Sequence, residues 1–84
     1  MTHSIAVHRQ ENMIWLSFHG TESNVFPYGR YFDLIRESLG CYTFEYDNCL
    51  PNVSRRAIQE SLNTLIRRVY RDVMENEPLT DDEV

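Results

Sequence analysis

The residues of this chain that could bind a metal ion are three histidines and two cysteines: His3, His8, His19, Cys41 and Cys49. A protein metal site needs three or four ligands that converge on one point. Two of the histidines share one face of a predicted hairpin and the third has the opposite parity, so at most two converge. The cysteines lie at the start of a predicted strand and in the turn after it, about 20 Å apart, too far for a disulfide bond. The sequence therefore predicts two free thiols and no metal site.

Serine and cysteine are also common catalytic nucleophiles, but none here stands in the strand, turn and helix context that activates one. No pair of carboxylates lies in an apolar, glycine-marked segment of the kind that general acid–base catalysis uses. Gly20, Gly29 and Gly40 are scattered, so they form no loop that could cradle a phosphate. We therefore expect a non-enzymatic protein that uses no cofactor.

The negative charge is concentrated at one end of the chain. Residues 75–84 hold five of the thirteen acidic residues and no basic one, whereas residues 1–74 hold eight arginines, eight acidic residues and no lysine. The formal net charge of −5 therefore comes from the C-terminal residues. This argues against both a basic nucleic-acid-binding domain and an evenly acidic DNA mimic. We expect one domain over residues 1–77 and a flexible acidic tail over residues 78–84.

The sequence also gives expectations about location and assembly. It contains neither a secretory signal nor an apolar stretch of the roughly 20 residues that a membrane-spanning helix needs. We therefore expect a cytoplasmic protein without a membrane partner. A chain of 84 residues builds a core near the lower limit for independent folding, which favours a homodimer whose interface adds stability.

The N-terminal part has the alternating pattern of two half-buried strands. Pairing them so that partner residue numbers sum to 23 leaves Glu11 and Asn12 as a two-residue hairpin turn. One face then carries the apolar side chains of Ile5, Val7, Ile14, Leu16 and Phe18. The other face carries Ala6, His8, Met13, Trp15 and Ser17, with the His8 ring stacked on Trp15 as a cross-strand pair.

Apolar residues at helical spacing predict two helices, over residues 28–39 and 53–76, with a strand over residues 41–47 between them. Residues 20–27 are rich in turn-forming residues and predict a loop. The handedness of crossover connections places the third strand beside the first and antiparallel to it. The predicted fold class is α+β: a two-layer ββαβα domain whose three-stranded, mostly antiparallel sheet has two helices on one face.

The uncovered face of the predicted sheet is the first candidate binding surface. Trp15, Met13 and His8 lie there among small residues, and a large aromatic residue in such a setting is typical of an interaction patch. The alternative is that the long second helix, or the loop over residues 20–27, covers Trp15. The sequence leaves these two interpretations open.

A strip of arginines on the second predicted helix is the other candidate surface. Arg56, Arg67 and Arg71 lie on the side away from the apolar stripe, where guanidinium groups can bind carboxylates or phosphates in forked geometry. The alternative is a solvated helix face with ion pairs at i,i+4 spacing, such as Arg68 with Asp72. The near-neutral domain and the lack of aromatic residues within the strip argue against a nucleic-acid partner.

Two segments of the chain resemble known proteins: residues 68–83, RVYRDVMENEPLTDDE, and residues 5–9, IAVHR. They are similar to uncharacterised small accessory proteins from the early regions of temperate tailed phages and prophages. The resemblance assigns no role to any residue. It implies a class of proteins that bind a host protein or complex, defence systems included, and modify or block it.

We therefore expect a small protein-binding domain that inhibits or modulates a host or defence complex in the host cytoplasm. The alternative is a small nucleic-acid-associated regulator that uses the arginine strip.

Overall fold

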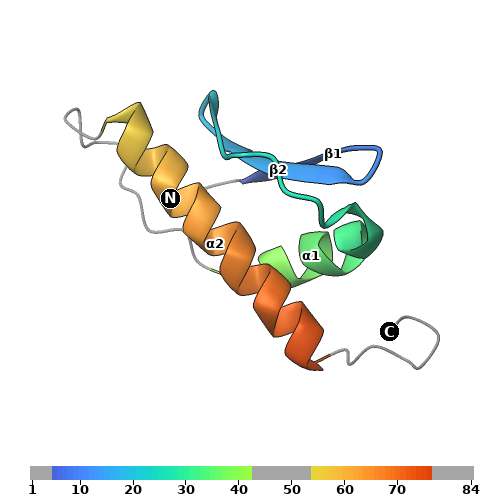
Figure 1. Cartoon of the computed structure of the whole chain (residues 1–84). Helices are drawn as coiled ribbons and strands as arrows, with labels where there is room; N and C mark the ends of the chain where they lie inside the picture. Colours follow the sequence, from blue (N-terminus) through green and yellow to red (C-terminus); the bar gives the residue numbers. More distant parts are fainter. Residues whose placement is uncertain (1–4, 43–53, 77–84) are drawn as a thin grey trace.

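The computed structural model describes residues 5–42 and 54–76, which form a sheet layer and a helix layer (Figure 1). In chain order the elements are β1 (Ala6–Gln10), β2 (Met13–Phe18), β3 (Thr21–Glu22), the 3-10 helix η1 (Gly29–Tyr31), α1 (Phe32–Leu39) and α2 (Arg55–Asn76). Within the described residues the strands form one antiparallel sheet in the order β1-β2-β3. Both α-helices lie on the same side of it. The predicted α+β class, with a three-stranded sheet and two helices, is confirmed.

The hairpin of β1 and β2 has the predicted register. Val7 lies opposite Leu16 and His8 opposite Trp15, so partner numbers sum to 23 and residues 11 and 12 make the turn. Glu11 has φ 57°, whereas Asn12 is not among the residues with positive φ. A positive φ at the first central residue alone is the pattern of a type II′ turn, in which glycine is the preferred residue. The backbone thus accepts an unfavourable residue at Glu11 to keep the apolar side chains on one face.

The third strand lies in the segment for which the sequence predicts a loop. His19 and Gly20 both have positive φ, as in a type I′ turn, and they reverse the chain so that Thr21 pairs with Phe18. The chain then continues beside β2 as far as an isolated bridge between Ile14 and Phe26. Between these two pairings the register slips by one residue, which makes a bulge. Ser23 fills this bulge, because its side-chain oxygen accepts a hydrogen bond from the Leu16 N–H at 2.8 Å.

Residues 41 and 42, the described part of the predicted strand over residues 41–47, do not form a strand. Cys41 and Tyr42 belong to a turn that follows α1, with their N–H groups donating to the carbonyls of Ser38 and Leu39 at 2.9 and 3.0 Å. Residues 43–47 lie outside the described residues, as do Cys49 and the predicted acidic tail over residues 78–84. Among the described strands β2 is central, between β1 and β3. The predicted pairing of residues 43–47 with the first strand lies outside the described residues.

The core lies between the sheet and the two helices. Ile14, Leu16 and Phe18 on β2 are 0 to 3% exposed and pack against apolar side chains of α1 and α2. The helix side of this core consists of Tyr31, Ile35, Leu39, Leu62, Ile66, Val69 and Val73. All seven belong to the apolar residues at helical spacing from which the two helices were predicted. The hydroxyl of Ser54 accepts a hydrogen bond from the Ala57 N–H at 3.1 Å and so caps α2.

A close backbone contact joins the hairpin turn to the helix layer. The Gly29 N–H donates to the Asn12 carbonyl at 2.7 Å. A Cβ atom at Gly29 would lie 2.5 Å from the backbone of Asn12, closer than side-chain carbons approach backbone atoms. Glycine is therefore required here by the approach of two chain segments. In the two described ranges, no helix combines the length and hydropathy that a bilayer crossing requires.

Candidate functional site

The outer face of β2 holds Trp15 in a fixed polar setting. The indole ring stacks on the His8 ring at a centroid distance of 5.4 Å and an interplanar angle of 20°. Its Nε1–H donates to the Glu22 carboxylate at 2.7 Å. His8 Nε2 and Ser17 Oγ form a hydrogen bond of 2.6 Å. The predicted placement of His8 and Trp15 on the face away from the helices, and their cross-strand stacking, are confirmed.

Trp15 is partly covered, but not sealed inside the monomer. Trp15 is of intermediate burial, and α2 lies on the opposite face of the sheet. The chain after β2 contributes Glu22 and Val25 beside it. Val25 is 51% exposed and Met13 is 36% exposed. Each of the two interpretations left open by the sequence holds in part: residues 20–27 shield one side of the indole, and the rest of the Trp15 side chain stays accessible.

A shallow pocket opens beside Trp15, with a cavity volume of about 440 Å³. We call it the outer pocket. Its lining residues come from the end of β1, the hairpin turn, β2, and β3 with the chain that follows it: Gln10, Glu11, Met13, Trp15, Glu22, Ser23 and Val25. Apolar side chains thus line a hollow that also contains two carboxylates. The described residues include no group of three or more His, Cys, Asp and Glu side chains that could hold a metal ion.

A stack of aromatic rings runs from Phe26, in the chain that follows β3, to α2. Phe26 stacks on Tyr28 at 5.5 Å with an interplanar angle of 13°, and Tyr28 stacks on Tyr70 of α2 at 3.8 Å and 4°. The guanidinium of Arg67 lies over the Phe26 ring, 5.1 Å from its centroid. Phe26 is buried, whereas Tyr28 and Tyr70 are of intermediate burial. Met74 lies one helical turn beyond Tyr70 and is also partly exposed.

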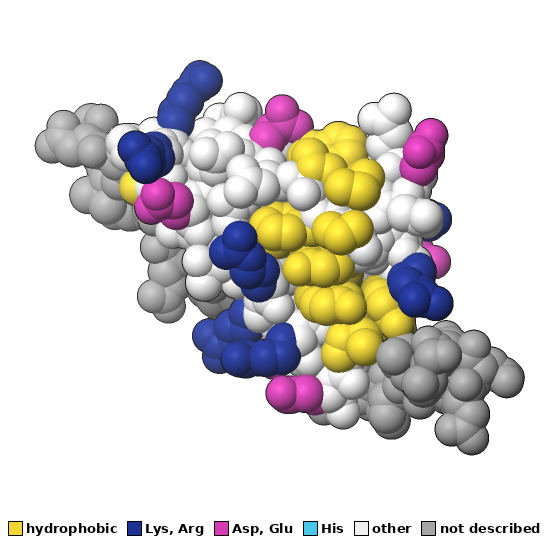
Figure 2. Space-filling model, viewed as in Figure 1, with side chains coloured by type: hydrophobic (Ala, Val, Ile, Leu, Met, Phe, Trp, Pro, Cys, Tyr) yellow, Lys and Arg dark blue, Asp and Glu magenta, His cyan; other side chains and the backbone are white. Residues whose placement is uncertain are grey.

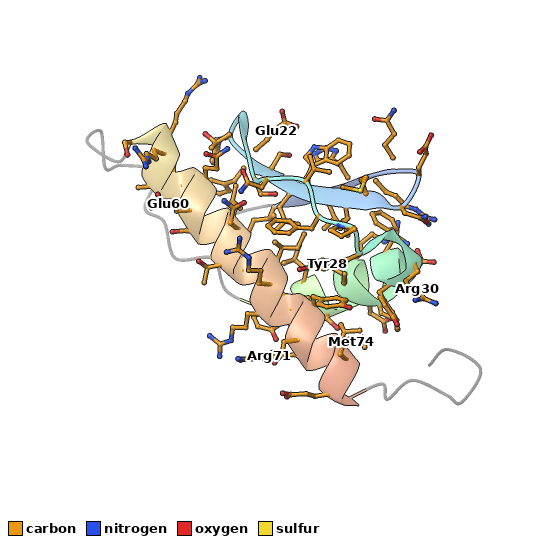
Figure 3. All side chains as sticks on the ribbon, in the orientation of Figure 1. Glu22, Tyr28, Arg30, Glu60, Arg71 and Met74 are labelled. Atoms are coloured by element: carbon orange, nitrogen blue, oxygen red, sulfur yellow. The ribbon has the colours of Figure 1, made fainter. Side chains whose placement is uncertain are left out.

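Together these side chains make a continuous apolar surface that we call the apolar band: Met13, Trp15, Val25, Tyr28, Tyr70 and Met74. Figure 2 shows a yellow band that crosses the molecule from the sheet layer to the helix layer, with dark blue arginines on both sides of it. In Figure 3, Tyr28 and Met74 lie near the middle of the view, with Arg71 and Arg30 on opposite sides and Glu22 near the upper end. An apolar surface with an arginine rim is typical of protein interfaces.

The arginines of α2 do not form one uniform strip. Arg56 forms an exposed pair with Glu60 at 3.4 Å, and Arg71 lies 4.0 Å from Asp72. Arg67 is packed over Phe26, so it belongs to the rim of the apolar band. Arg56 and Arg67 are eleven positions apart in the helix, which is about 16 Å along the axis. The structure therefore brings Arg67 and Arg71 near the apolar band and leaves Arg56 apart from them.

Two expectations for this helix face are wrong: one ion pair of the solvated-face alternative, and the lack of aromatic residues at the strip. Arg68 does not pair with Asp72; its guanidinium lies over the Tyr42 ring at 5.9 Å, and the Tyr42 hydroxyl donates to the Asp72 carboxylate. Aromatic rings also lie next to the strip, because the fold brings Phe26 against Arg67. Neither contact has a local sequence signal, since Arg68 and Tyr42 lie 26 positions apart and Arg67 and Phe26 lie 41 positions apart.

The sequence prediction missed five members of the site: Glu22, Val25, Tyr28, Tyr70 and Met74. The first two lie in the segment predicted as a loop, and the helical spacing places Tyr28 on the buried side of a predicted helix. The available signal was the spacing of Tyr70 and Met74, which lie four residues apart and outside the main apolar stripe of α2. Comparisons with protein-family models, with curated proteins and with solved structures found no match to this chain.

Proposed function

We propose that this chain is a non-catalytic protein-binding domain whose recognition surface is the apolar band. The observation that supports this proposal is the continuity of the band, from the outer pocket across the strand edge to the end of α2. Tryptophan, tyrosine and arginine are the side chains that dominate binding energy in protein interfaces, and all three are present here. The ring stacks and the hydrogen bond of Trp15 hold these side chains in place before a partner arrives, which lowers the entropy cost of binding.

The resemblance to accessory proteins of temperate tailed phages supports a particular class of partner. On this proposal the partner is a protein or protein complex of the host, and binding modifies or blocks it in the host cytoplasm. The proposal includes a homodimer as the working assembly, because so small a core benefits from an interface. Sedimentation at several protein concentrations measures that assembly independently of any partner.

Affinity capture from host lysate, followed by binding measurements with the purified partner, tests the recognition surface. The wild type is compared with Trp15→Ala, with Tyr28→Ala and with Glu37→Ala, which changes an exposed residue of α1 outside the band. We expect each band variant to weaken binding by about 30-fold, the effect of losing about 2 kcal/mol at a central aromatic contact. We expect the Glu37 variant to bind as the wild type does.

The proposal is wrong if no host protein binds specifically, or if both band variants retain the full affinity of the wild type. Circular dichroism of each variant separates a loss of contact from a loss of fold. Tyr28→Phe is a second control, because it keeps the ring that stacks on Tyr70 and removes only the hydroxyl. We expect it to bind within about threefold of the wild type.

A specific observation favours a second candidate, a nucleic-acid-associated regulator. Arg67 lies over an aromatic ring that is stacked in turn on two tyrosines, and rings beside cations can bind single-stranded nucleic acid. The net charge of −5 opposes this candidate. A titration with a single-stranded oligonucleotide at several salt concentrations distinguishes the two, since nucleic-acid binding weakens steeply as salt rises. We expect no measurable binding.

A further inference from the structure

The outer pocket has the chemistry of a receptor for a cationic side chain. We propose that it binds an arginine side chain presented by the partner, an inference that rests on the proposed function and names the chemistry that the partner must offer. The walls of the pocket provide the aromatic ring of Trp15, the apolar side chains of Met13 and Val25, and the carboxylates of Glu11 and Glu22. A guanidinium group on an aliphatic stem complements each of these three kinds of surface.

The charge of the pocket is uncompensated within the described parts of the chain. Its lining includes two carboxylates and no cationic side chain. Neither Glu11 nor Glu22 is a member of a salt bridge among the described residues. The neighbouring Arg9 does not fill the pocket, because its guanidinium lies over the Phe32 ring of α1, 5.8 Å from the centroid, and its Nε donates to the Glu11 main-chain oxygen. A positive group from outside would therefore meet two carboxylates that form no ion pair among the described residues.

The Trp15 ring is held in position to receive such a group. Its stack on His8 fixes the plane of the ring, and its hydrogen bond to Glu22 places one carboxylate at the ring edge. A guanidinium can lie against the exposed part of the indole, within the roughly 6 Å range of cation–π attraction, while it donates to Glu22. Lysine offers a point charge without the planar, forked donor group, so we expect it to bind more weakly.

The size and exposure of the pocket suit a side chain of another protein. The volume of about 440 Å³ falls in the range of roughly 300 to 1,000 Å³ that is usual for binding pockets. Met13 and Val25, which line it, are 36 and 51% exposed, so the pocket opens to solvent along one side. The aliphatic part of an arginine can cover these two side chains while its backbone stays on the partner. The pocket then forms one end of the apolar band, and the partner's apolar residues cover the rest.

Blocked tripeptides that contain one central residue between alanines test the proposal. The probes are the arginine peptide, the matched citrulline peptide, which has nearly the same shape without the charge, and the lysine peptide. Each is titrated into the ¹⁵N-labelled full chain, and the resonances of the Trp15 indole N–H and of the Glu11 and Glu22 amides are followed. We expect saturable shifts at these positions with the arginine peptide. We expect the citrulline peptide to bind about tenfold more weakly or worse, and the lysine peptide between the two.

Single substitutions of glutamate by glutamine identify the carboxylates that bind the arginine peptide. We expect Glu22→Gln and Glu11→Gln each to weaken the arginine peptide by about three- to tenfold. Glu60→Gln is the matched control, because it removes an exposed carboxylate of α2 that pairs with Arg56 and does not line the pocket. We expect that variant to bind as the wild type does. Raising the salt concentration should weaken the arginine peptide and leave the citrulline peptide nearly unchanged.

Three results would overturn the arginine pocket: no saturable shift at these resonances, equal binding of arginine and citrulline, or equal effects of the Glu22 and Glu60 substitutions. Separate results decide whether the proposed function is right. One possible result is that the arginine peptide does not bind, while Tyr28→Ala still weakens binding of the protein partner. The arginine pocket is then wrong, and the band remains the binding surface. If the arginine peptide binds as expected while both band variants retain the partner fully, the pocket is real and the proposed function is wrong.

Discussion

The two faces of β2 are built from alternate residues of a single strand, and they differ in almost every physical respect. On the inner face, Ile14, Leu16 and Phe18 are 0 to 3% exposed and pack against apolar neighbours from the helices. On the outer face, Trp15 is held by a ring stack and by a hydrogen bond to a carboxylate, and it stays in partial contact with water. The inner face is therefore a source of stability, and the outer face is a surface on which side chains are positioned but not enclosed.

This difference assigns separate roles to neighbouring residues. Removing an inner side chain should lower stability, because it leaves a cavity that the packed core cannot refill. Removing an outer side chain should have little effect on stability and should act on binding. Comparing substitutions across this strand therefore tests whether the molecule divides its residues between folding and recognition.

The largest expected effect comes from Leu16→Ala on the inner face. We expect it to lower the free energy of unfolding by about 2 to 5 kcal/mol, the usual range for a buried leucine. Its neighbour Trp15→Ala should cost only about 1 kcal/mol, because the ring is already partly solvated. Urea denaturation followed by circular dichroism measures both. Equal losses of unfolding free energy in the two variants would contradict separate roles for the two faces. If Leu16→Ala does not fold at all, Ile14→Val gives a milder inner change, expected at about 0.5 to 1.5 kcal/mol.

The next effect tests whether the hairpin turn and the helix layer form one rigid unit. Gly29→Ala places a Cβ atom 2.5 Å from the Asn12 backbone, so the two segments must separate. We expect a loss of about 2 to 3 kcal/mol, typical of overpacking at a site that cannot relax. Gly40→Ala is the matched control, since the nearest atom to its Cβ would be 3.4 Å away and Gly40 has an ordinary helical φ of −61°. Thermal unfolding of the two variants should differ by more than about 5 °C.

A smaller effect is expected from two serines next to β2: Ser23, which bonds to its backbone from the chain after β3, and Ser17, on its outer face. Ser23→Ala removes the acceptor of the Leu16 N–H in the bulge, and we expect a loss of about 1 to 2 kcal/mol from the unsatisfied buried donor. Ser17→Ala removes the partner of His8 on the outer face, where water can replace the hydroxyl, so we expect a loss below about 0.5 kcal/mol. Chemical denaturation measures both values. A larger loss at Ser17 than at Ser23 would contradict the bulge as a structural element.

The smallest expected effect is a gain in stability. Glu11 has φ 57°, a region in which a residue other than glycine is strained. We expect Glu11→Gly to raise the free energy of unfolding by about 0.5 kcal/mol, since the relief of strain exceeds the extra entropy of glycine in the unfolded chain. The same change should weaken the arginine peptide, because it also removes a pocket carboxylate. A variant that is less stable than the wild type would show that Glu11 has contacts that outweigh its strain.

The parts of the fold that the sequence predicted are those in which apolar side chains determine the structure. The alternation in residues 5–18 was sufficient for the hairpin register, because a slip of one residue would expose Leu16. The apolar spacing likewise predicted α1 and α2. The third strand escaped prediction because its buried side chains, Thr21 and Ser23, are polar, and because its register is set by a bulge.

The site was predicted only in part, for a related reason. Trp15, His8 and Met13 follow from the hairpin register, so local pattern was enough to place them on one face. The stack of Tyr28 on Tyr70 joins residues 42 positions apart in the sequence, and the hydrogen bond from Trp15 to Glu22 depends on a strand that the pattern did not reveal. Contacts between distant segments require the arrangement of the elements, which a local pattern does not specify.

Hydrogen–deuterium exchange of the full chain, alone and bound to its captured partner, tests the central claim most directly. We expect the partner to slow exchange at residues 13–15, 22–28 and 70–74, which carry the apolar band, and to leave residues 55–62 of α2 unchanged. Slowed exchange at residues 55–62, with no change at residues 22–28, would place the binding surface on the arginine-bearing side of the helix and would contradict the apolar band as the recognition surface.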